Sequence, residues 1–306
     1  MPYLSWQIHS NNQMLMVNNP NNIALINFKG FIVGNGATDW DFDVSPSFPD
    51  ILFNFNIMPR SVLNNYTTNN CSNSFNDVYP PTNTTICQEL WDQINNLWNG
   101  LNWYDLFRKT YPYYDQATNE TESRMKTVMV NGEEKTYKSG MTFQEYLRWL
   151  KFMPAYMAER PVQGSFLSDY INRPDTRRAL NIPDSVQGWN MCSDPVGNNY
   201  HLQYEGSIWI YKILMQYNYR FLFYSGDTDG AVGTWGTRQW IDTLNLNIVQ
   251  KWRPWNIDGQ VSGYLINYEN GFDFATVHGV GHLAPQWKRK DVTTFFTNWI
   301  HQQPIN

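Results

Sequence analysis

The chain has 306 residues, enough for about two domains, and its 22 Lys and Arg against 27 Asp and Glu give a net charge of −5. This balance argues against binding to a nucleic-acid backbone, because such contacts need clustered cations. Aromatic residues make up 16% of the chain, too much packing material for a disordered protein, and no apolar run nears the roughly 20 residues of a membrane span.

The first section, residues 1 to about 44, has the pattern of a helix followed by a strand. A short helix is expected from Pro2 to about Gln13, and an apolar strand over Phe28–Val33. Gly34-Asn35-Gly36 follow the strand directly and indicate a turn. The first residues contain neither the basic nor the apolar region of a signal peptide.

The second section, residues of about 45 to 165, differs in character and is interpreted as an inserted, mostly helical subdomain. Val128–Glu133 predict a β-hairpin, because the Asn-Gly pair at its centre suits a two-residue turn. Thr142–Glu145 form a capping box that is expected to open a helix through Met153. Another helix is expected where apolar residues recur at helical spacing, at Leu90, Ile94, Leu97, Trp98 and Leu101.

From about residue 166 onward, helix and strand patterns alternate, which favours an α/β fold. Ile208, Tyr211 and Met215 mark an amphipathic helix. Phe221–Tyr224 is a continuous apolar run, typical of a strand that is buried on both faces of a sheet.

The end of the chain is predicted to hold a hairpin and a closing helix. Strands over Tyr264–Tyr268 and Phe272–Val277 flank Asn270-Gly271, a pair that favours a tight turn. Asp291 is expected to cap the closing helix, which carries Phe295, Phe296, Trp299 and Ile300.

Four Asn-x-Ser/Thr sequences lie close together, and three of them surround two cysteines in a polar stretch. Chance is an even alternative for any single site in so Asn-rich a chain, but the cluster is typical of an exposed loop of a secretory protein. Cys71 and Cys87 flank this loop and favour a local disulfide; Cys192 is then left over, either paired elsewhere or a buried thiol. The predicted glycosylation sites are Asn65, Asn70, Asn83 and Asn119.

Two loops at the ends of predicted strands carry residues that are able to catalyse. In an open α/β sheet, reactive residues gather at the carboxyl ends of strands. Residues 225–230 follow the strand that ends at Tyr224, and residues 278–285 follow the strand that ends near Val277. A carboxylate followed by an imidazole matches the last two members of an α/β-hydrolase triad. There the imidazole takes a proton from a nucleophile, and the carboxylate fixes the imidazole tautomer.

Each of these loops also has a simpler interpretation. An Asp after a strand more often caps a turn than catalyses. His278 and His282 have the spacing of a metal pair, but the Gly-Val-Gly between them is poor helix sequence, and no third ligand cluster has suitable spacing. We therefore expect no metal site. The other histidines are expected to be structural or solvent-facing: His9, His201 and His301.

Three sequence blocks match those of one known family, in the same order along the chain. Residues 26–39 (INFKGFIVGNGATD) are similar to a strand block NLKGxxxGNGxTD, residues 224–229 (YSGDTD) to YSGDxD, and residues 279–285 (GVGHLAP) to GAGHxxP. Residues 170–180 and 189–193 add weaker support. With these blocks, the sequence resembles the serine carboxypeptidase family, which has the α/β-hydrolase fold.

The resemblance implies a fold, an activity and a set of site residues. It assigns Asp229 and His282 to the catalytic triad, and Leu283 to the pocket for the leaving residue. Residues 1–44 and 166–306 would form the hydrolase core, and residues 45–165 the family's mainly helical cap insertion. The implied activity is release of C-terminal residues from peptides or proteins through an acyl-enzyme, with no cofactor. The implied location is a lysosome, a vacuole or the cell exterior.

The resemblance also makes an absence conspicuous. The family's nucleophile elbow, GESYAG, has no counterpart here, since no G-x-S-x-G occurs in the sequence, and the NGGPGCSS block that supplies an oxyanion donor is missing too. Pro2–Ser5 resembles the end of the segment that follows the elbow. We therefore expect a truncated form or fragment whose serine comes from an upstream segment or another chain. The family counterpart of Cys192 bridges to a cysteine in that upstream part.

Two alternatives stay open at this point. Instead of a truncated carboxypeptidase, the chain is a shortened, non-catalytic paralogue that acts as a binding or structural subunit, or a relative that transfers acyl groups with the same triad. Sequence alone does not separate hydrolysis from acyl transfer.

Overall fold

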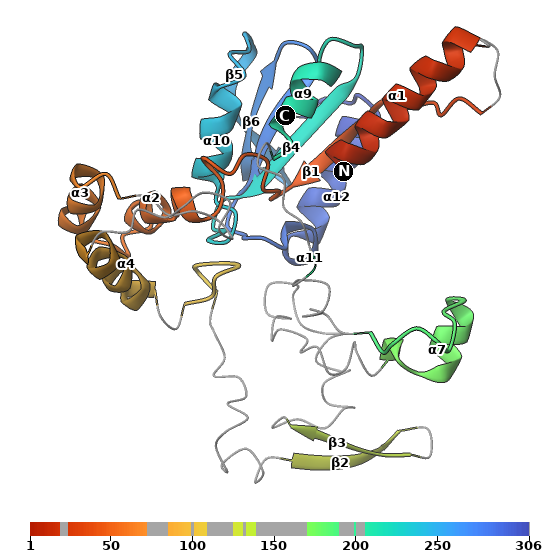
Figure 1. Ribbon diagram of the computed structural model, residues 1–306, viewed down its shortest axis with the longest axis horizontal. Helices are drawn as coiled ribbons and strands as arrows, with labels where there is room; N and C mark the ends of the chain where they lie inside the picture. Colours follow the sequence, from red (N-terminus) through yellow and green to blue (C-terminus); the bar gives the residue numbers. More distant parts are fainter. Residues whose placement is uncertain are drawn as a thin grey trace. The chain divides into compact units, whose positions relative to one another are not determined.

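The computed structural model describes residues 1–18, 24–71, 85–98, 101–108, 125–130, 133–138, 170–189, 199 and 206–305. The chain divides into two compact units (Figure 1). The first unit combines Met1–Thr110 with Leu202–Asn306, and the second is Tyr111–His201. The domain boundaries expected from the sequence, at about residues 44 and 165, stay a prediction.

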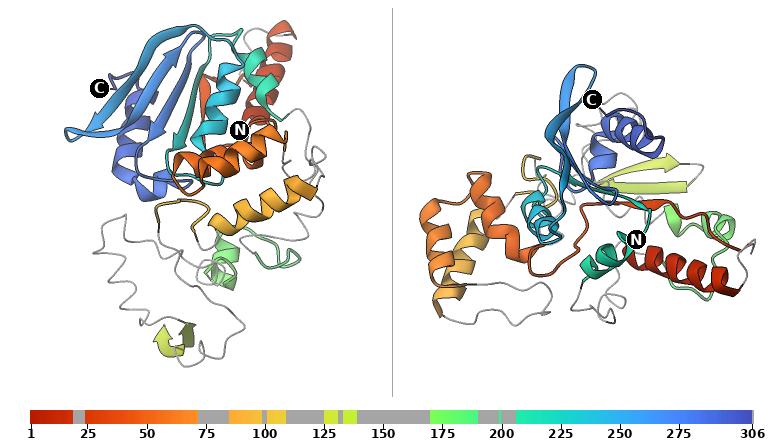
Figure 2. Two further views of the ribbon diagram at one scale, coloured as in Figure 1. Left: turned by 90° about the vertical axis from the view of Figure 1, so that its left-hand side faces the viewer. Right: turned by 90° about the horizontal axis from the view of Figure 1, so that it is seen from above.

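A five-stranded mixed sheet forms the centre of the first unit (Figures 1 and 2). Strands β1 (Gly30–Gly34), β4 (Arg220–Gly226) and β7 (Phe272–Val277) run parallel, and β6 (Gln260–Tyr268) and β5 (Ile248–Ile257) continue the sheet antiparallel, in the order β1-β4-β7-β6-β5. The predicted hairpin is confirmed, since β6 pairs with β7 across the turn. The α/β prediction is confirmed at the level of a mixed sheet with helices on both of its faces.

Strand β4 separates two hydrophobic cores because its side chains alternate between the two faces of the sheet. Phe221 and Phe223 are buried in one core, beneath α9 (Ile208–Leu214) and α10 (Thr234–Asp242). Leu222 and Tyr224 are buried in the other core, beneath α11 (Ala284–Trp287) and α12 (Arg289–Ile300). The central apolar run is therefore buried on both sides, as the sequence predicts.

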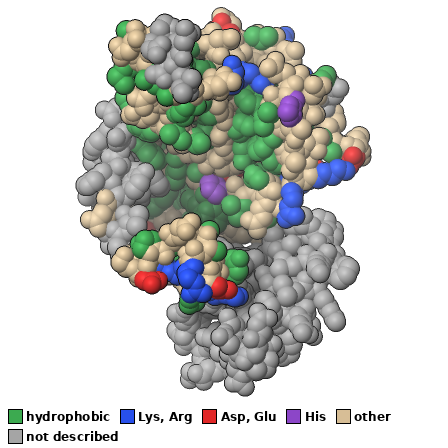
Figure 3. Space-filling view, turned by 90° about the vertical axis from the view of Figure 1, so that its right-hand side faces the viewer, with side chains coloured by type: hydrophobic (Ala, Val, Ile, Leu, Met, Phe, Trp, Pro, Cys, Tyr) green, Lys and Arg blue, Asp and Glu red, His purple; other side chains and the backbone are tan. Residues whose placement is uncertain are grey.

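Helix α1 (Pro2–Asn18) extends beyond the predicted end near Gln13 and is apolar on more than one side. Trp6 packs against the first core, and the buried His9 ring bonds to the Tyr219 hydroxyl. Leu4 and Val17 are exposed. Hydrophobic side chains likewise lie at the surface over much of the face drawn in Figure 3.

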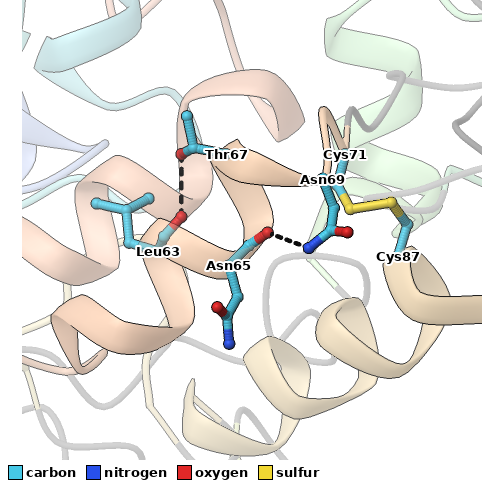
Figure 4. The surroundings of a disulfide bond; sticks show 6 residues. All are labelled: Leu63, Asn65, Thr67, Asn69, Cys71 and Cys87. Carbon is cyan, nitrogen blue, oxygen red and sulfur yellow. Dashed lines mark hydrogen bonds between the residues drawn. A yellow bond between two sulfur atoms is a disulfide. The ribbon is translucent and has the colours of Figure 1, made fainter.

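Short helices between β1 and the later strands form a third hydrophobic cluster. These are α2 (Phe48–Asn54), α3 (Arg60–Thr68) and α4 (Thr85–Trp98); the 3₁₀ turn η1 (Ser45–Ser47) directly precedes α2. The predicted helix is confirmed as α4, but Leu101 lies beyond its end. A disulfide joins Cys71, just after α3, to Cys87 in the first turn of α4 (Figure 4), as predicted.

The second unit contains the other predicted hairpin. Strands β2 (Met125–Val130) and β3 (Glu133–Lys138) pair antiparallel, with Val130 opposite Glu133 (Figure 1). Helix α7 (Pro174–Ala179) follows, and the Asn172 amide bonds to the backbone of Trp189. The helix predicted from Thr142 lies outside the described residues.

The closing helix corrects one detail of the prediction. Helix α12 begins at Arg289, so Asp291 lies in its first turn instead of capping it, and the residue at the cap position is Lys288. An acidic side chain in the first turn is still favoured by the helix dipole, which explains why Asp291 resembles a start signal. No helix in the described part of the chain has the length and apolar character needed to cross a membrane.

Candidate functional site

Two loops meet at the carboxyl ends of β4 and β7. These strands are parallel neighbours, with Gly226 opposite Val277, so the loops that follow them leave the sheet side by side. The backbone N–H of Asp227 donates to the Val277 carbonyl, and the N–H of Thr228 donates to the Val280 carbonyl. The two loops that the sequence singles out are therefore in direct contact.

The loops bring Asp229 and His282 together. His282 Nδ1 lies 2.8 Å from Asp229 Oδ2. The Asp229 side chain is fully buried and that of His282 is 28% exposed. Because an ionised carboxylate only accepts hydrogen bonds, Nδ1 is the donor. Nε2 is then the ring nitrogen left to take up a proton, which is the arrangement a general base requires.

Asn35 is a further partner of Asp229 that sequence reasoning took only as part of a turn. Its Nδ2 donates to Asp229 Oδ2 at 2.7 Å, and its Oδ1 accepts from the Gly226 N–H at 3.3 Å. The backbone of Asn35 has φ 44°, and its N–H donates to the Tyr224 carbonyl. This left-handed conformation, which Asn tolerates better than most residues, turns the side chain from the end of β1 toward β4. The Ala231 N–H donates to the remaining oxygen, Oδ1.

A second His–carboxylate pair lies in the same two loops but differs in exposure. His278 Nδ1 is 2.7 Å from Asp227 Oδ2, and the Gly279 N–H donates to Oδ1. The His278 side chain is 60% exposed. The two histidines thus each have their own carboxylate. In the described part of the chain no three His, Cys, Asp or Glu side chains are placed to hold a metal ion together.

Two glycines allow the loops to approach this closely. A Cβ on Gly226 would lie 2.2 Å from the Gly281 carbonyl oxygen, and a Cβ on Gly281 would lie 2.0 Å from the Tyr104 carbonyl oxygen. Both distances are far inside van der Waals contact. Neither position therefore accepts a side chain without displacing backbone.

A third segment, which sequence reasoning missed, covers both loops. Residues 101–108 follow α4, and we call them the strap. Its backbone bonds to both loops. The Leu106 N–H donates to the Thr228 carbonyl at 2.9 Å, and the His282 N–H donates to the Tyr104 carbonyl at 2.7 Å. The ring of Tyr104 lies 5.3 Å from the ring of His282, centroid to centroid. No periodic pattern marks the strap in the sequence, because its contacts are made by backbone groups and single side chains.

Leu283 stands beside His282 and is 41% exposed, at the residue preceding α11. Its predicted place in a leaving-residue pocket is compatible with this exposure and stays a prediction. Of the other histidines, His9 is buried in α1 and His301 is exposed at the end of α12, while His201 lies outside the described residues.

Of the four predicted glycosylation sites, two lie among the described residues. Asn65 and Asn70 are exposed, at α3 and just after it, whereas Asn83 and Asn119 lie outside the described residues, as does Cys192. Figure 4 shows the Asn65 side chain pointing away from the disulfide. Glycosylation at these sites stays a prediction.

A buried carboxyl group organises the turn that follows Asn35. Asp43 Oδ2 accepts the N–H groups of Thr38 at 2.6 Å and Asp39 at 3.0 Å. Burial raises the pKa of Asp43 to about 7, although the two N–H groups act in the opposite direction. Burial also raises the pKa of the neighbouring Tyr211 hydroxyl, and the Asp43 charge adds to that increase.

Comparison with known proteins places this chain in a family. The model of the serine carboxypeptidase family matches residues 1–302. Serine carboxypeptidase 1 of Hordeum vulgare is 27% identical over 295 residues, 90% of this chain and 56% of the relative. Serine carboxypeptidase ctsa-4.1 of Caenorhabditis elegans is 28% identical over 291 residues, 90% of this chain and 58% of the relative. The chain thus spans little more than half the length of these relatives.

The fold agrees with a solved structure. The crystal structure of Kex1(delta)p, a prohormone-processing carboxypeptidase from Saccharomyces cerevisiae, matches with a TM-score of 0.59 at 16% identity, over 94% of this chain and 58% of that one. A shorter match reaches 40% identity over 141 residues, 45% of this chain and 32% of the relative, with serine carboxypeptidase-like 16 of Arabidopsis thaliana. Since the family match covers nearly the whole sequence, this chain belongs to the serine carboxypeptidase family.

Proposed function

We propose that this chain supplies the carboxylate and the imidazole base of a serine-type carboxypeptidase, which removes C-terminal residues from peptides. The observation that carries the proposal is the buried Asp229 carboxylate bonded to Nδ1 of a partly exposed His282. In a hydrolytic triad this carboxylate fixes the imidazole tautomer and stabilises the imidazolium that forms. Asn35 and the Ala231 N–H hold the carboxylate in place from its other sides.

The proposed reaction uses His282 Nε2, the ring nitrogen that is not bonded to Asp229. His282 Nε2 takes the proton of a serine hydroxyl while the serine oxygen attacks the carbonyl carbon of the last peptide bond. The C–N bond breaks, the imidazolium gives its proton to the leaving amine, and an acyl-enzyme remains. Water, deprotonated by the same nitrogen, then hydrolyses the ester and returns the serine. Leu283, beside His282, would contact the leaving residue.

We propose that the serine lies in a polypeptide segment outside these 306 residues. No G-x-S-x-G occurs in the 306 residues, and the matched relatives are much longer than this chain. We propose that an upstream segment or a second chain provides both the nucleophile and the oxyanion donors. The disulfide between Cys71 and Cys87 and the exposed sequons support a place in the secretory pathway, ending in a lysosome, a vacuole or outside the cell.

A non-catalytic role is the second candidate function. It applies if no serine-bearing segment joins these 306 residues. Under this alternative the chain is a binding or structural subunit, and the pair of Asp229 and His282 only stabilises the contact between the two loops.

Co-expression with the serine-bearing N-terminal segment of a serine carboxypeptidase tests the proposal. The co-purified complex is expected to release the C-terminal residue from N-blocked peptides. His282→Ala should lower kcat by at least about 10³-fold, because the base is lost. His278→Ala is the matched control, since it removes the other carboxylate-bonded imidazole, and we expect a change of less than about threefold.

The outcomes separate the candidates. A complex that forms but releases no more product than its His282→Ala variant would contradict the carboxypeptidase proposal and favour the subunit role. Equal losses in both histidine variants would also contradict it. If an added alcohol or amine diverts the acyl group from water, the same residues perform acyl transfer.

A further inference from the structure

Asp105, in the strap, is a buried residue whose carboxylate accepts four hydrogen bonds from other described residues. It is 1% exposed. Its Oδ1 accepts the Thr228 hydroxyl at 2.7 Å and the Phe107 N–H at 3.1 Å. Its Oδ2 accepts Arg108 Nε at 2.6 Å and the Gly281 N–H at 3.1 Å. This residue does not figure in the sequence-based site.

The two longer-range bonds reach the neighbours of the proposed catalytic residues. Thr228 directly precedes Asp229, and Gly281 directly precedes His282. One oxygen of Asp105 therefore holds the loop of Asp229, and the other holds the loop of His282. These partners lie 123 and 176 residues away along the chain.

The strap backbone reinforces the hold on the Asp229 loop. The Leu106 N–H donates to the Thr228 carbonyl at 2.9 Å, and the Gly230 N–H donates to the Trp103 carbonyl at 3.1 Å. Asp229 is thus bracketed by strap bonds at the residues before and after it. The bond from the His282 N–H to the Tyr104 carbonyl does the same for the base.

A purely local role for Asp105 explains only half of its contacts. The bonds to Phe107 and Arg108 shape the strap itself, and the Arg108 guanidinium lies 4.1 Å from the centre of the Trp287 ring. The bonds to Thr228 and Gly281 are not needed for that turn. Each oxygen of Asp105 accepts hydrogen bonds from one local and one distant partner. The carboxylate therefore links the strap to both loops.

We propose that Asp105 is a positioning residue for the Asp229–His282 pair. The inference rests on the proposed function of that pair and adds how its geometry is set. Misplacement of reacting groups by about 1 Å costs about 10²-fold in rate. A carboxylate that fixes both loops from outside the reaction therefore controls the rate without touching the substrate.

Asp105→Asn tests this with little change in volume. Asn keeps one acceptor oxygen and replaces the other with a donor, so it is unable to accept from both Thr228 and Gly281. We expect the low-field NMR resonance of the His282 Nδ1 proton to shift or broaden, and the amides of Gly281 and His282 to exchange at least about 10-fold faster. Amides of β4 should keep their protection, because the sheet is intact.

Asp227→Asn is the matched control, because Asp227 also accepts a backbone N–H and a side-chain group in the same two loops. It should leave the His282 resonance and the Gly281 amide unchanged. In the complex with the serine-bearing segment, Asp105→Asn should lower kcat about 10-fold or more with little change in KM. Asp227→Asn should change kcat by less than about twofold.

A second pair of variants keeps the test decisive if Asp105→Asn does not fold. Gly281→Ala places a methyl group 2.0 Å from the Tyr104 carbonyl oxygen and so pushes the strap away from the loop. Gly279→Ala, in the same loop, meets no atom within 4 Å and strains only its own backbone at φ 69°. Gly281→Ala should disturb the His282 resonance, and Gly279→Ala should not.

The inference is overturned if the His282 resonance and the Gly281 and His282 amides are unchanged in Asp105→Asn, or if protection falls equally in β4. The spectroscopic measurements need no turnover. A complex without activity would therefore remove the proposed function while the resonances still decide whether Asp105 holds the pair.

Discussion

At the scale of single residues, Asp43 shows how burial changes the pKa of a carboxyl group. It is fully buried, and its Oδ2 accepts two backbone N–H groups. Its Oδ1 has no hydrogen-bond partner among the described residues. A buried carboxyl group with one oxygen unsatisfied favours the neutral form. The raised pKa of Asp43, about 7, has burial as its main cause.

This pKa predicts how stability depends on pH. The folded chain keeps the Asp43 proton up to about pH 7, whereas the unfolded chain loses it near the ordinary value of 3.8. Between these values the folded state binds more protons, so the contribution of Asp43 to the free energy of unfolding falls as pH rises. Asp43→Asn does not titrate. We therefore expect wild type to lose on the order of a few kcal/mol relative to this variant between pH 4 and pH 8.

Urea unfolding at several pH values measures that difference. Asp41→Asn, at an exposed side chain in the same turn, is the control for removing a negative charge. Parallel pH profiles of wild type and Asp43→Asn would show that the carboxyl group is ionised in the folded chain.

At the scale of elements, the disulfide links two short helices, α3 and α4. It joins the residue after α3 to the first turn of α4, and both cysteines are buried in the third hydrophobic cluster. The strap begins shortly after α4. The helices and the site-covering segment are thus parts of one continuous stretch of chain.

Removal of the disulfide should lower the free energy of unfolding by about 3 kcal/mol, as expected from loop-closure entropy for a loop of this length. The Cys71→Ser, Cys87→Ser double variant tests this in urea unfolding. Reducing agent should lower the stability of wild type and have no effect on the variant. If both proteins unfold at the same urea concentration without reductant, the bridge does not constrain the unfolded chain.

The elements that sequence patterns predicted have a regular apolar period, a continuous apolar run or a turn pair between two strands. Helix α4 and the pair β6–β7 belong here, and so does the buried run in β4. Strand β5 was missed because Trp255 is its only buried residue, a proline (Pro254) lies within it, and its pairing with β6 contains register shifts. Helix α10 was missed because Gly236 lies inside it; a Cβ there would lie 2.3 Å from the Phe42 carbonyl oxygen.

At the scale of the whole molecule, the site joins segments that are far apart in the sequence. Asn35 and Asp229 are 194 residues apart, and Asp105 and Gly281 are 176 apart. The sequence predicted the two loops because both follow strands whose ends meet, and the family resemblance singled out Asp229 and His282 within them. It did not predict Asn35 or Asp105, because a single polar residue in a turn carries no mark of its distant partner. Such contacts depend on the completed sheet.

The structure shows which predicted glycosylation sites are exposed, and this allows a test on the whole protein. Asn65 and Asn70 are exposed, so a transferase could reach both in a chain that enters the secretory pathway. When the protein is secreted from a eukaryotic host behind a signal peptide, Asn65→Gln and Asn70→Gln should each remove the mass of one glycan. Gel mobility before and after glycosidase treatment measures this. An unchanged mass in Asn65→Gln would remove that site from the prediction.

The contact between Gly226 and the carbonyl of Gly281 has a practical consequence for library screening. A saturation scan of the two loops would rank these positions as intolerant as Asp229 and His282, although neither glycine has a functional group to offer a reaction. Intolerance scores alone would then enlarge the apparent catalytic set. Measuring the amount of each folded variant together with its activity separates steric disruption of the fold from loss of a catalytic group.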